Sequence, residues 1–240
     1  MNLKVLSWNI WCGTYLEGVI DFLKHVDADI VALQEVSDDS RGNLAEIIAK
    51  KLGYEYVFDT QVDMPLKYLP GYESNDERTI KFGNAILSKH KIIHSEVHLL
   101  GENGKKSAVQ ARIEVGSNIL NVFSVHLLHT HQQPSEAQNK QAENLLKFLP
   151  KENMMVMGDF NSLPESTVIK SMNETLYNTE PSSNTPTWSV YKEGCTECLV
   201  DEIKYKLDYI FTSKDLISNS FTVHESKASD HLPVSVIIEI

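Results

Sequence analysis

Short apolar runs alternate with amphipathic stretches along the chain. Residues 3–8 and 29–34 are predominantly apolar, which predicts two buried strands. Residues 16–25 and 43–52 repeat apolar side chains every three or four positions, the spacing of one helix face. Gly53 follows the second stretch and is expected to end that helix, because glycine readily adopts the left-handed conformation common there.

The same alternation continues through the rest of the sequence. Further strands are predicted at residues 54–58, 82–88, 92–99, 107–115, 118–126, 154–157, 206–212, 220–224 and 233–240, and further helices at 134–149 and 164–172. Gly116 and Ser117 separate two of these strands and predict a hairpin. Residues 59–80 and 178–204 are polar and are predicted to be long loops, which often carry function.

The order of these elements predicts the fold class. The sequence has no internal repeat, low-complexity segment or linker, so we expect a single domain over residues 1–240. Strands and helices are interleaved throughout, with hairpins in the middle. This order predicts an α/β fold in which two mixed β-sheets pack face to face and helices lie outside them.

The composition excludes several classes of protein. The 240 residues are 42% hydrophobic and 23% charged, which is not the balance of a disordered chain. No apolar run approaches the roughly 18 residues that cross a bilayer, so no membrane anchor is expected. The net charge of −11 argues against a protein that coats nucleic acid, since phosphate backbones attract clustered Lys and Arg. An acidic enzyme can still act on nucleic acid through a bound cation.

The three cysteines suit a reducing compartment better than a disulfide scaffold. Because the first residues, Met1–Leu6, show no apolar stretch of the kind found in secretion signals, we expect a cytoplasmic protein. Cys195 and Cys198 form a C-x-x-C pair without a second pair or a nearby histidine. We interpret them as two thiols in an exposed loop rather than as a zinc site. The chain is taken to be a monomer.

Polar side chains repeatedly follow or interrupt the apolar strands. They are carboxylates, amides and imidazoles, namely Asn9, Gln34, Glu35, His126, Asp159, Asn161, Asp208, Asp230 and His231. One such aspartate alone would most simply be a turn or cap residue. A whole set is different, because a carboxylate among apolar side chains costs several kcal/mol unless it is paired or coordinated. The set predicts a polar site along one edge of the sandwich.

The oxygen-bearing members of this set indicate a hard metal ion. Glu35, Asp159 and Asp230 supply carboxylates, and Asn9 and Asn161 supply amide oxygens. Such ligands suit Mg²⁺, with Mn²⁺ as an alternative, and do not suit zinc. Mg²⁺ commonly binds one or two carboxylates together with a substrate phosphate.

Two imidazoles accompany these oxygens, from His126 and His231. Imidazoles beside carboxylates transfer protons near neutral pH. A metal, a general base and amide donors, without a motif for a nucleophilic Ser or Cys, indicate metal-assisted hydrolysis of a phosphate ester.

These residues stand in motifs that can be compared with known families. The motifs are, in chain order, Trp8-Asn9, Leu33-Gln34-Glu35-Val36, Gly83-Asn84-Ala85-Ile86-Leu87-Ser88, Ser124-Val125-His126-Leu127, Gly158-Asp159-Phe160-Asn161, Leu207-Asp208-Tyr209-Ile210-Phe211 and Ser229-Asp230-His231-Leu232-Pro233. Together they resemble the endonuclease/exonuclease/phosphatase superfamily, that of DNase I and exonuclease III, over essentially all 240 residues. The resemblance implies a four-layer α/β sandwich and Mg²⁺-dependent hydrolysis of phosphodiesters or phosphomonoesters.

The resemblance also implies roles for the acidic residues. Glu35 resembles the principal metal ligand, with Asn9 and Asp230 near the same ion. Asp159 resembles the residue that positions or deprotonates the attacking water. Asp208 resembles the carboxylate that orients a catalytic imidazole.

The remaining catalytic residues are assigned in the same way. Asn161 resembles the amide that holds a phosphate oxygen or the nucleophile. His231 resembles the imidazole against the scissile phosphate, and His126 matches the histidine of the DNase I-like branch. The resemblance does not assign the general acid and the general base between them.

Three residues are candidates for substrate binding. Lys106 stands about where many members of the superfamily carry an Arg or Tyr that grips phosphate, but it lacks the bidentate fork of Arg. A solvated edge-strand lysine is an equal alternative. Trp11 and Trp188 could stack on bases, worth on the order of 1–3 kcal/mol per base, although Trp11 could equally be a packing residue.

The sequence supports one function hypothesis and two alternatives. The first is a Mg²⁺-dependent phosphodiesterase or nuclease that acts on DNA or another nucleotide phosphodiester. The second is a phosphatase or phosphodiesterase for a small or lipid-linked phosphate, and the third is a catalytically silent binding module. The sequence does not choose between endo- and exonucleolytic cleavage, or between one and two metal ions.

Overall fold

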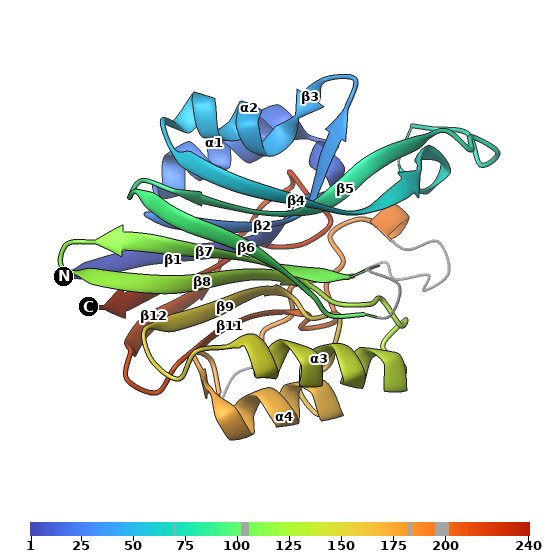
Figure 1. Ribbon diagram of the computed structural model, residues 1–240. Coiled ribbons are helices and arrows are strands. Elements are labelled where there is room, and N and C mark those ends of the chain that lie inside the picture. Colours follow the sequence, from blue (N-terminus) through green and yellow to red (C-terminus); the bar gives the residue numbers. More distant parts are fainter. Residues whose placement is uncertain (70, 102–105, 182–183, 195–201) are drawn as a thin grey trace.

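The computed structural model describes residues 1–240 except 70, 102–105, 182–183 and 195–201. Its strands form two mixed sheets that pack against each other, and a pair of helices covers the outer face of each sheet (Figure 1). This four-layer α/β sandwich confirms the predicted fold class.

Among the described residues, the first sheet has seven strands, and it pairs strands from the two ends of the chain. In spatial order its main path is β12 (Ile217–Val223), β13 (Val234–Glu239), β1 (Asn2–Asn9), β2 (Ile30–Asp39), β5 (Thr79–Ser88) and β4 (Glu55–Pro65), and the short β3 (Gly42–Asn43) pairs with β2. β1 and β2 are parallel, with α1 in the crossover between them. Parallel neighbours need such a crossover, which is why a helix covers this face.

The second sheet has six strands within the described ranges. Its order is β10 (Tyr177–Asn178), β11 (Asp208–Thr212), β9 (Met154–Asp159), β8 (Asn118–His126), β7 (Ser107–Val115) and β6 (Ile92–Leu99). β7 and β8 form the hairpin predicted from Gly116 and Ser117. β8 and β9 are parallel, and α3 lies in the crossover between them.

In the part of the chain that the structure describes, four α-helices lie outside the sheets: α1 (Leu16–Val26) and α2 (Leu44–Leu52) on the first, and α3 (Glu136–Phe148) and α4 (Thr167–Thr175) on the second. The side chains of Asn43, Ser135 and Ser166 cap α2, α3 and α4 by accepting a backbone N–H of the first turn. Gly53 ends α2 at φ 72°, as predicted. Short 3₁₀ turns occupy Trp11–Gly13 (η1), Leu66–Tyr68 (η2) and Lys192–Gly194 (η4).

The core has a layer between the sheets and a layer beneath each helix pair. Along β1, Leu3 and Val5 belong to the layer between the sheets, while Leu6 and Trp8 belong to the layer under α1 and α2. Successive strand residues face opposite sides, so a strand buried on both faces must be apolar at nearly every position. Each fully buried aliphatic side chain contributes about 1.5–3 kcal/mol, which favours this register of β1 over a slipped one.

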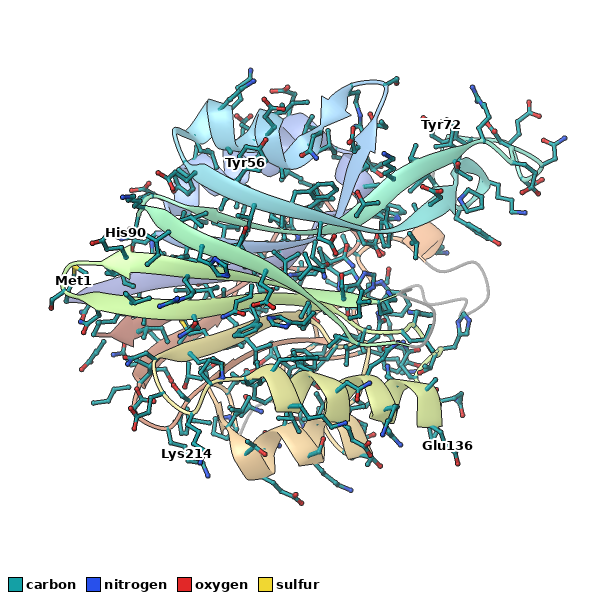
Figure 2. The ribbon with its side chains drawn as sticks, in the orientation of Figure 1. Met1, Tyr56, Tyr72, His90, Glu136 and Lys214 are labelled. Atoms are coloured by element: carbon teal, nitrogen blue, oxygen red, sulfur yellow. The ribbon has the colours of Figure 1, made fainter. Side chains whose placement is uncertain are left out.

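The prediction of a loop over residues 59–80 is wrong at both ends, because residues 59–65 belong to β4 and residues 79–80 to β5, while no strand lies among the described residues between them. β4 continues to Pro65 and pairs with β5 from Thr79, so the two strands form a long ribbon that carries Tyr72 beyond the sandwich (Figure 2). A β-bulge between Thr60 and Val62 shifts the register. Bulges break the alternation of apolar and polar positions, which is the physical reason why the pattern was not recognised as a strand.

The register of the strands brings the ends of distant segments to one edge. In the second sheet Asp159 is paired with His126 on one side and with Asp208 on the other. In the first sheet Asn9 is paired with Gln34. Figure 2 shows Glu136, at the start of α3, at the same end of the molecule as the ribbon with Tyr72, whereas Met1, His90 and Lys214 lie toward the other end. No helix among the described residues is long and apolar enough to span a bilayer.

Candidate active site

The sequence pattern placed Glu35 just after the end of a strand, but in the structure it lies within β2. β2 continues past it to Asp39, and the pairing with β5 is interrupted between Leu33 and Val36. Glu35 has a left-handed backbone at φ 52°, which L-residues adopt rarely. This bulge aims the carboxylate at the edge of the sandwich, and such backbone strain is commonly found at functional sites.

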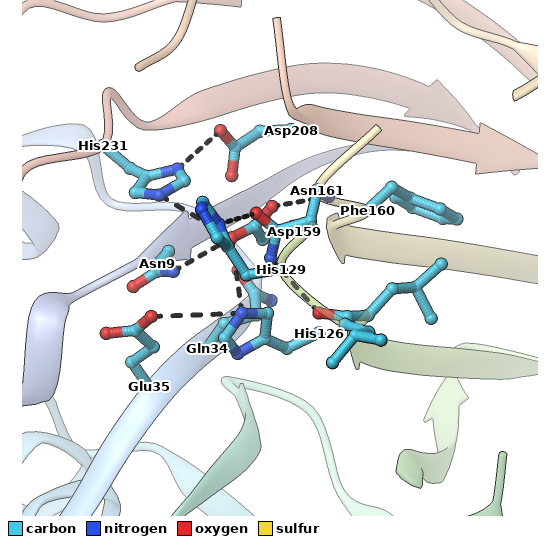
Figure 3. Close-up of polar contacts among 12 residues, drawn as sticks. Asn9, Gln34, Glu35, His126, His129, Asp159, Phe160, Asn161, Asp208 and His231 are labelled. Carbon is cyan, nitrogen blue, oxygen red and sulfur yellow. Dashed lines mark hydrogen bonds and ion pairs between the residues drawn. The ribbon is translucent and has the colours of Figure 1, made fainter. Parts of the chain in front are cut away.

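Asp159 lies at the centre of the site (Figure 3). Its side chain is 1% exposed, and its Oδ2 accepts a hydrogen bond of 3.1 Å from Asn9 Nδ2. The same oxygen lies 3.5 Å from His126 Nε2 and 3.6 Å from His231 Nε2. Its Oδ1 accepts the backbone N–H of Asn161 at 2.8 Å. One carboxylate therefore joins groups from both sheets and is fixed in orientation.

Asp208 and His231 form a buried dyad. His231 Nδ1 lies 2.9 Å from Asp208 Oδ2, and Thr187 Oγ1 donates to that same oxygen at 2.6 Å. Burial lowers the pKa of His231, but the carboxylates of Asp208, Asp159 and Asp230 outweigh it and hold the pKa well above its usual value. The imidazole therefore carries a proton at neutral pH and directs Nε2 toward Asp159.

Trp188 is buried and positions Asp230 through its indole N–H. Its indole N–H donates to Asp230 Oδ2 at 3.0 Å, and the side chain is 1% exposed. The other oxygen, Oδ1, accepts from Ser229 Oγ at 3.3 Å. Burial raises the pKa of Asp230. The stacking of Trp188 on a substrate base stays a prediction, while its contact with a predicted metal ligand is an observation.

Lys106 lies beside the carboxylates. Burial lowers the pKa of Lys106 to about 8, and the negative charges of Asp159 and Glu35 oppose this fall. Burial also lowers the pKa of His126 well below its usual value, and the charge of Lys106 lowers it further. The neutral imidazole of His126 packs edge-on against Phe82, with 5.7 Å between ring centroids. Lys106 therefore lies near Asp159 and Glu35, and its grip on phosphate stays a prediction.

Trp11 begins η1, just after β1, and is only 5% exposed. Its ring is stacked on Tyr191 with 5.6 Å between centroids and also contacts Tyr15. Its backbone N–H donates to Asn9 Oδ1 at 3.1 Å, which fixes the Asn9 amide. The role of Trp11 in stacking on a base stays a prediction. Cys195 and Cys198 lie outside the described residues.

The sequence analysis missed His129. Its Nδ1 donates to Asn161 Oδ1 at 2.8 Å, and its Nε2 lies 3.2 Å from His131 Nδ1. His129 therefore fixes the orientation of the Asn161 amide, which also donates to Leu127 O at 3.2 Å. The signal in the sequence was that His129 and His131 follow closely after His126, in the loop after β8.

A chain of amides and hydroxyls links the two sheets beneath the site, and the sequence analysis named these residues without predicting this role. Gln34 Nε2 donates to Ser124 Oγ at 3.0 Å, and Ser124 Oγ donates to Leu33 O at 3.1 Å. Asn84 Nδ2 donates to Ser107 O at 3.2 Å. Buried polar groups with partners of this kind fix a register that apolar packing alone would leave free.

The sequence profile of the Endonuclease/Exonuclease/phosphatase family matches residues 6–231. The chain belongs to this family. Its members are phosphoesterase hydrolases that generally depend on divalent metal ions. A comparison with curated proteins by sequence found no match.

Solved structures of other proteins have the same fold as this chain. An endonuclease/exonuclease/phosphatase from Beutenbergia cavernae DSM 12333 has a TM-score of 0.78 at 20% identity, over 100% of this chain and 72% of that one. An AP endonuclease from Archaeoglobus fulgidus has a TM-score of 0.72 at 19% identity, over 99% and 100%. The human Nocturnin catalytic domain with bound sulfate has 0.68 at 20% identity, over 99% and 93%. At these identities the likeness establishes the fold alone.

The carboxylates of the site fit the divalent ion on which the family generally depends. Burial and the charge of Asp230 raise the pKa of Glu35 to about 7, and burial raises that of Asp159 to about 6. Buried carboxylates that repel one another are stabilised by a bound cation. Carboxylate and amide oxygens suit Mg²⁺ or Mn²⁺. Glu35 and Asp230, with the amide of Asn9, could therefore hold such an ion.

A second group of possible ligands is less suitable for a metal. Single ligand atoms of Asp159, Asp208 and His231 all lie within 4.8 Å of one another. Here Asp208 Oδ2 is already hydrogen-bonded to Nδ1 of an imidazole whose pKa is held well above its usual value. A protonated imidazole repels a cation, so this group is better described as the hydrogen-bonded dyad of Asp208 and His231 beside Asp159.

The shifted pKa values predict how the metal-free protein responds to pH. The pKa of Glu35 rises on folding from 4.5 to about 7, so the folded state holds more protons than the unfolded state between these values. The contribution of Glu35 to stability in EDTA is therefore greatest below pH 4.5 and is lost as the pH rises through about 7. Relative to Glu35→Gln, the Tm of the wild type should drop on the order of 5 °C between pH 5 and 8.

Thermal unfolding followed by circular dichroism measures this difference. The Glu35→Gln protein is the matched control because it keeps the size of the side chain and removes its titration. Excess Mg²⁺ should reduce the drop in the wild type, since a ligand that binds the folded state stabilises it. If the Tm of the two proteins changed with pH in the same way in EDTA, Glu35 would not be the cause of the pH-dependent loss of stability.

Proposed function

We propose that the protein is a divalent-metal-dependent phosphodiesterase that cleaves nucleic acid or a nucleotide phosphodiester by attack of water. The observation that carries the proposal is the convergence on Asp159 of Asn9, His126 and His231. A phosphate ester needs a group that activates water, a proton donor and neutralisation of charge, and this edge of the sandwich offers side chains for each.

Each residue has a role in this proposal. Asp159 orients and deprotonates the attacking water, because its raised pKa makes it a stronger base than an exposed aspartate. Asn161, fixed by His129, donates its amide to a phosphate oxygen. Lys106 attracts the phosphate. A metal ion held by Glu35 would neutralise charge that develops on the phosphate oxygens.

The two imidazoles differ in protonation and are assigned different tasks. The Asp208 carboxylate keeps His231 protonated, so His231 donates a hydrogen bond or a proton to the phosphate oxygens. His126 is held neutral by burial and by Lys106, so it accepts a proton or orients a bound water. Of the similar structures, one is named an AP endonuclease and another binds sulfate, which supports a site for phosphodiester oxyanions.

A second candidate is a phosphatase or phosphodiesterase for a small or lipid-linked phosphate. It is favoured by the charge of a hollow of about 930 Å³ between η1 and the β4–β5 ribbon. Arg41, Arg78 and Lys81 line it together with acidic residues, and salt bridges join Arg41 to Asp39 and Arg78 to Asp76. Balanced charges of this kind do not form the basic track that a long nucleic acid prefers.

Metal dependence and substrate range are tested together. The protein should turn over supercoiled plasmid, an oligonucleotide or bis-p-nitrophenyl phosphate with Mg²⁺ or Mn²⁺ and should lose activity in EDTA. Glu35→Ala should raise the Mg²⁺ concentration for half-maximal rate by about 10- to 100-fold, with less effect on the rate at saturation. Hydrolysis of p-nitrophenyl phosphate alone would select the second candidate. No turnover of any substrate with Mg²⁺, Mn²⁺ or Ca²⁺ would leave a binding module.

A further inference from the structure

A cavity of about 230 Å³ lies beside the candidate active site, between the loop after β8 and the loop after β9. It is lined by Thr130, Gln132, Gln133, Pro134 and Gln138 from the first loop and the start of α3, and by Asn161, Ser162, Leu163 and Glu165 from the second. Ligand pockets for drug-sized molecules measure roughly 300–1,000 Å³, so this cavity suits one smaller group.

Three polar atoms of the lining lack a partner among the described residues. They are Thr130 Oγ1, Gln132 Nε2 and Ser162 Oγ, all buried. Ser162 is only 2% exposed. Buried polar groups are nearly always hydrogen-bonded, so three orphans in one lining indicate a ligand that supplies the missing partners.

The walls of the cavity are fixed before a ligand arrives. Gln138 Nε2 donates to Leu128 O at 2.7 Å and to Asn161 O at 2.9 Å, so it ties one loop to the other. The caps of α3 and α4 are already satisfied by Ser135 and Ser166. The two helices pack side by side and begin at the same end of the molecule (Figure 1). The unpartnered atoms of Thr130, Gln132 and Ser162 are therefore not needed to cap either helix.

The lining selects for a neutral polar group. Its described side chains are mostly amides and hydroxyls, with Pro134 and Leu163 as apolar surface and Glu165 as a carboxylate. No Lys or Arg belongs to the described lining, so a second phosphate would meet no opposite charge there. Amide side chains recognise the donor and acceptor edges of bases, and apolar surface accepts their faces.

Asn161 connects the cavity to the chemistry. It lines the cavity, its backbone N–H is bound to Asp159, and its amide is bound to His129. A group seated in the cavity would thus be next to a phosphate held at Asp159. Resting on the proposed phosphodiesterase function, we propose that this cavity binds the nucleoside attached to the scissile phosphate, which makes the substrate a nucleotide phosphodiester.

The test compares substrates that share a leaving group and differ in the nucleoside. The p-nitrophenyl esters of thymidine 5′-phosphate and adenosine 5′-phosphate carry one, and bis-p-nitrophenyl phosphate does not. The triple variant Thr130→Val, Gln132→Leu and Ser162→Ala removes the three unpartnered atoms with little change of shape. It should raise KM for the nucleoside esters about tenfold or more and change kcat/KM for bis-p-nitrophenyl phosphate less than twofold.

The matched control carries Ser171→Ala and Thr175→Val, on α4 away from the cavity. It should change neither KM for the nucleoside esters nor kcat/KM for bis-p-nitrophenyl phosphate. The single variant Gln132→Leu keeps the test available if the triple variant does not fold. Equal effects on both substrates, or no effect on either, would overturn the nucleoside site.

A binding measurement separates this proposal from the proposed activity. Calorimetry with thymidine and adenosine, which carry no phosphate, should give binding to the wild type and the control, with at least tenfold weaker binding to the triple variant. Nucleoside binding without hydrolysis of any ester would refute the enzyme and keep the cavity. Hydrolysis of bis-p-nitrophenyl phosphate with no nucleoside binding would do the reverse.

Discussion

Replacing Asp159 with asparagine should lower kcat for phosphodiester hydrolysis by about 10²–10⁴-fold, the range that a positioned general base supplies. The carboxylate is 1% exposed and its Oδ2 lies between the Nε2 atoms of His126 and His231. Asparagine keeps the size of the side chain but cannot take a proton from water. Because burial raises the pKa of Asp159 to about 6, the wild-type rate should also fall as the pH drops below this value.

Steady-state kinetics with saturating Mg²⁺ measures the change, and circular dichroism checks the fold. The matched control is Asp21→Asn, which makes the same substitution at an exposed position of α1. KM should change little, because Asp159 acts on the water rather than on bound substrate. A wild-type kcat in the Asp159→Asn protein would show that another group activates the water.

The arrangement of the strands around Asp159 was accessible from the sequence for a physical reason. His126, Asp159 and Asp208 each adjoin a run that is apolar on both faces, and such runs can only be central strands. The ends of neighbouring strands meet at one edge, so residues at those ends must come together. The two-layer arrangement of mixed sheets follows from the same runs.

Other features could not be read from the pattern. The bulge that holds Glu35 at φ 52° depends on pairing with β5, which is a tertiary contact. The continuation of β4 from residue 59 to Pro65 was hidden by a second bulge. His129 is one of several histidines in the chain, and only its 2.8 Å contact with Asn161 distinguishes it. The cavity at Ser162 arises where two loops meet, and loop packing has no sequence period.

Replacing His231 with alanine is expected to lower kcat by about 10²–10³-fold, the usual cost of removing one donor from the site of developing charge. His231 is held by Asp208 at 2.9 Å and directs its other nitrogen toward Asp159. The substitution removes a proton donor and leaves Asp208, which is fully buried, without its imidazole partner. The free energy of unfolding should therefore be measured beside kcat.

Asp208→Asn separates positioning from catalysis, because Asp208 touches His231 and Thr187 rather than the substrate in this proposal. The Asp208 charge is the leading cause that raises the pKa of His231, so asparagine should lower that pKa. Activity that needs a protonated imidazole is lost as the pH rises through its pKa. The alkaline limb of the pH–rate profile should consequently move to lower pH in Asp208→Asn, whereas a merely structural role would lower the rate at every pH alike.

The double variant Asp208→Asn, His231→Ala tests whether the two residues act as one unit, because residues that do so have non-additive effects. If Asp208 works only through His231, adding Asp208→Asn to His231→Ala should reduce kcat no further than His231→Ala alone. The free energies of activation from the four proteins give the coupling directly. Additive losses would mean that the 2.9 Å contact between the two side chains is not what links Asp208 to the reaction, and that Asp208 acts on Asp159 or the phosphate by its charge.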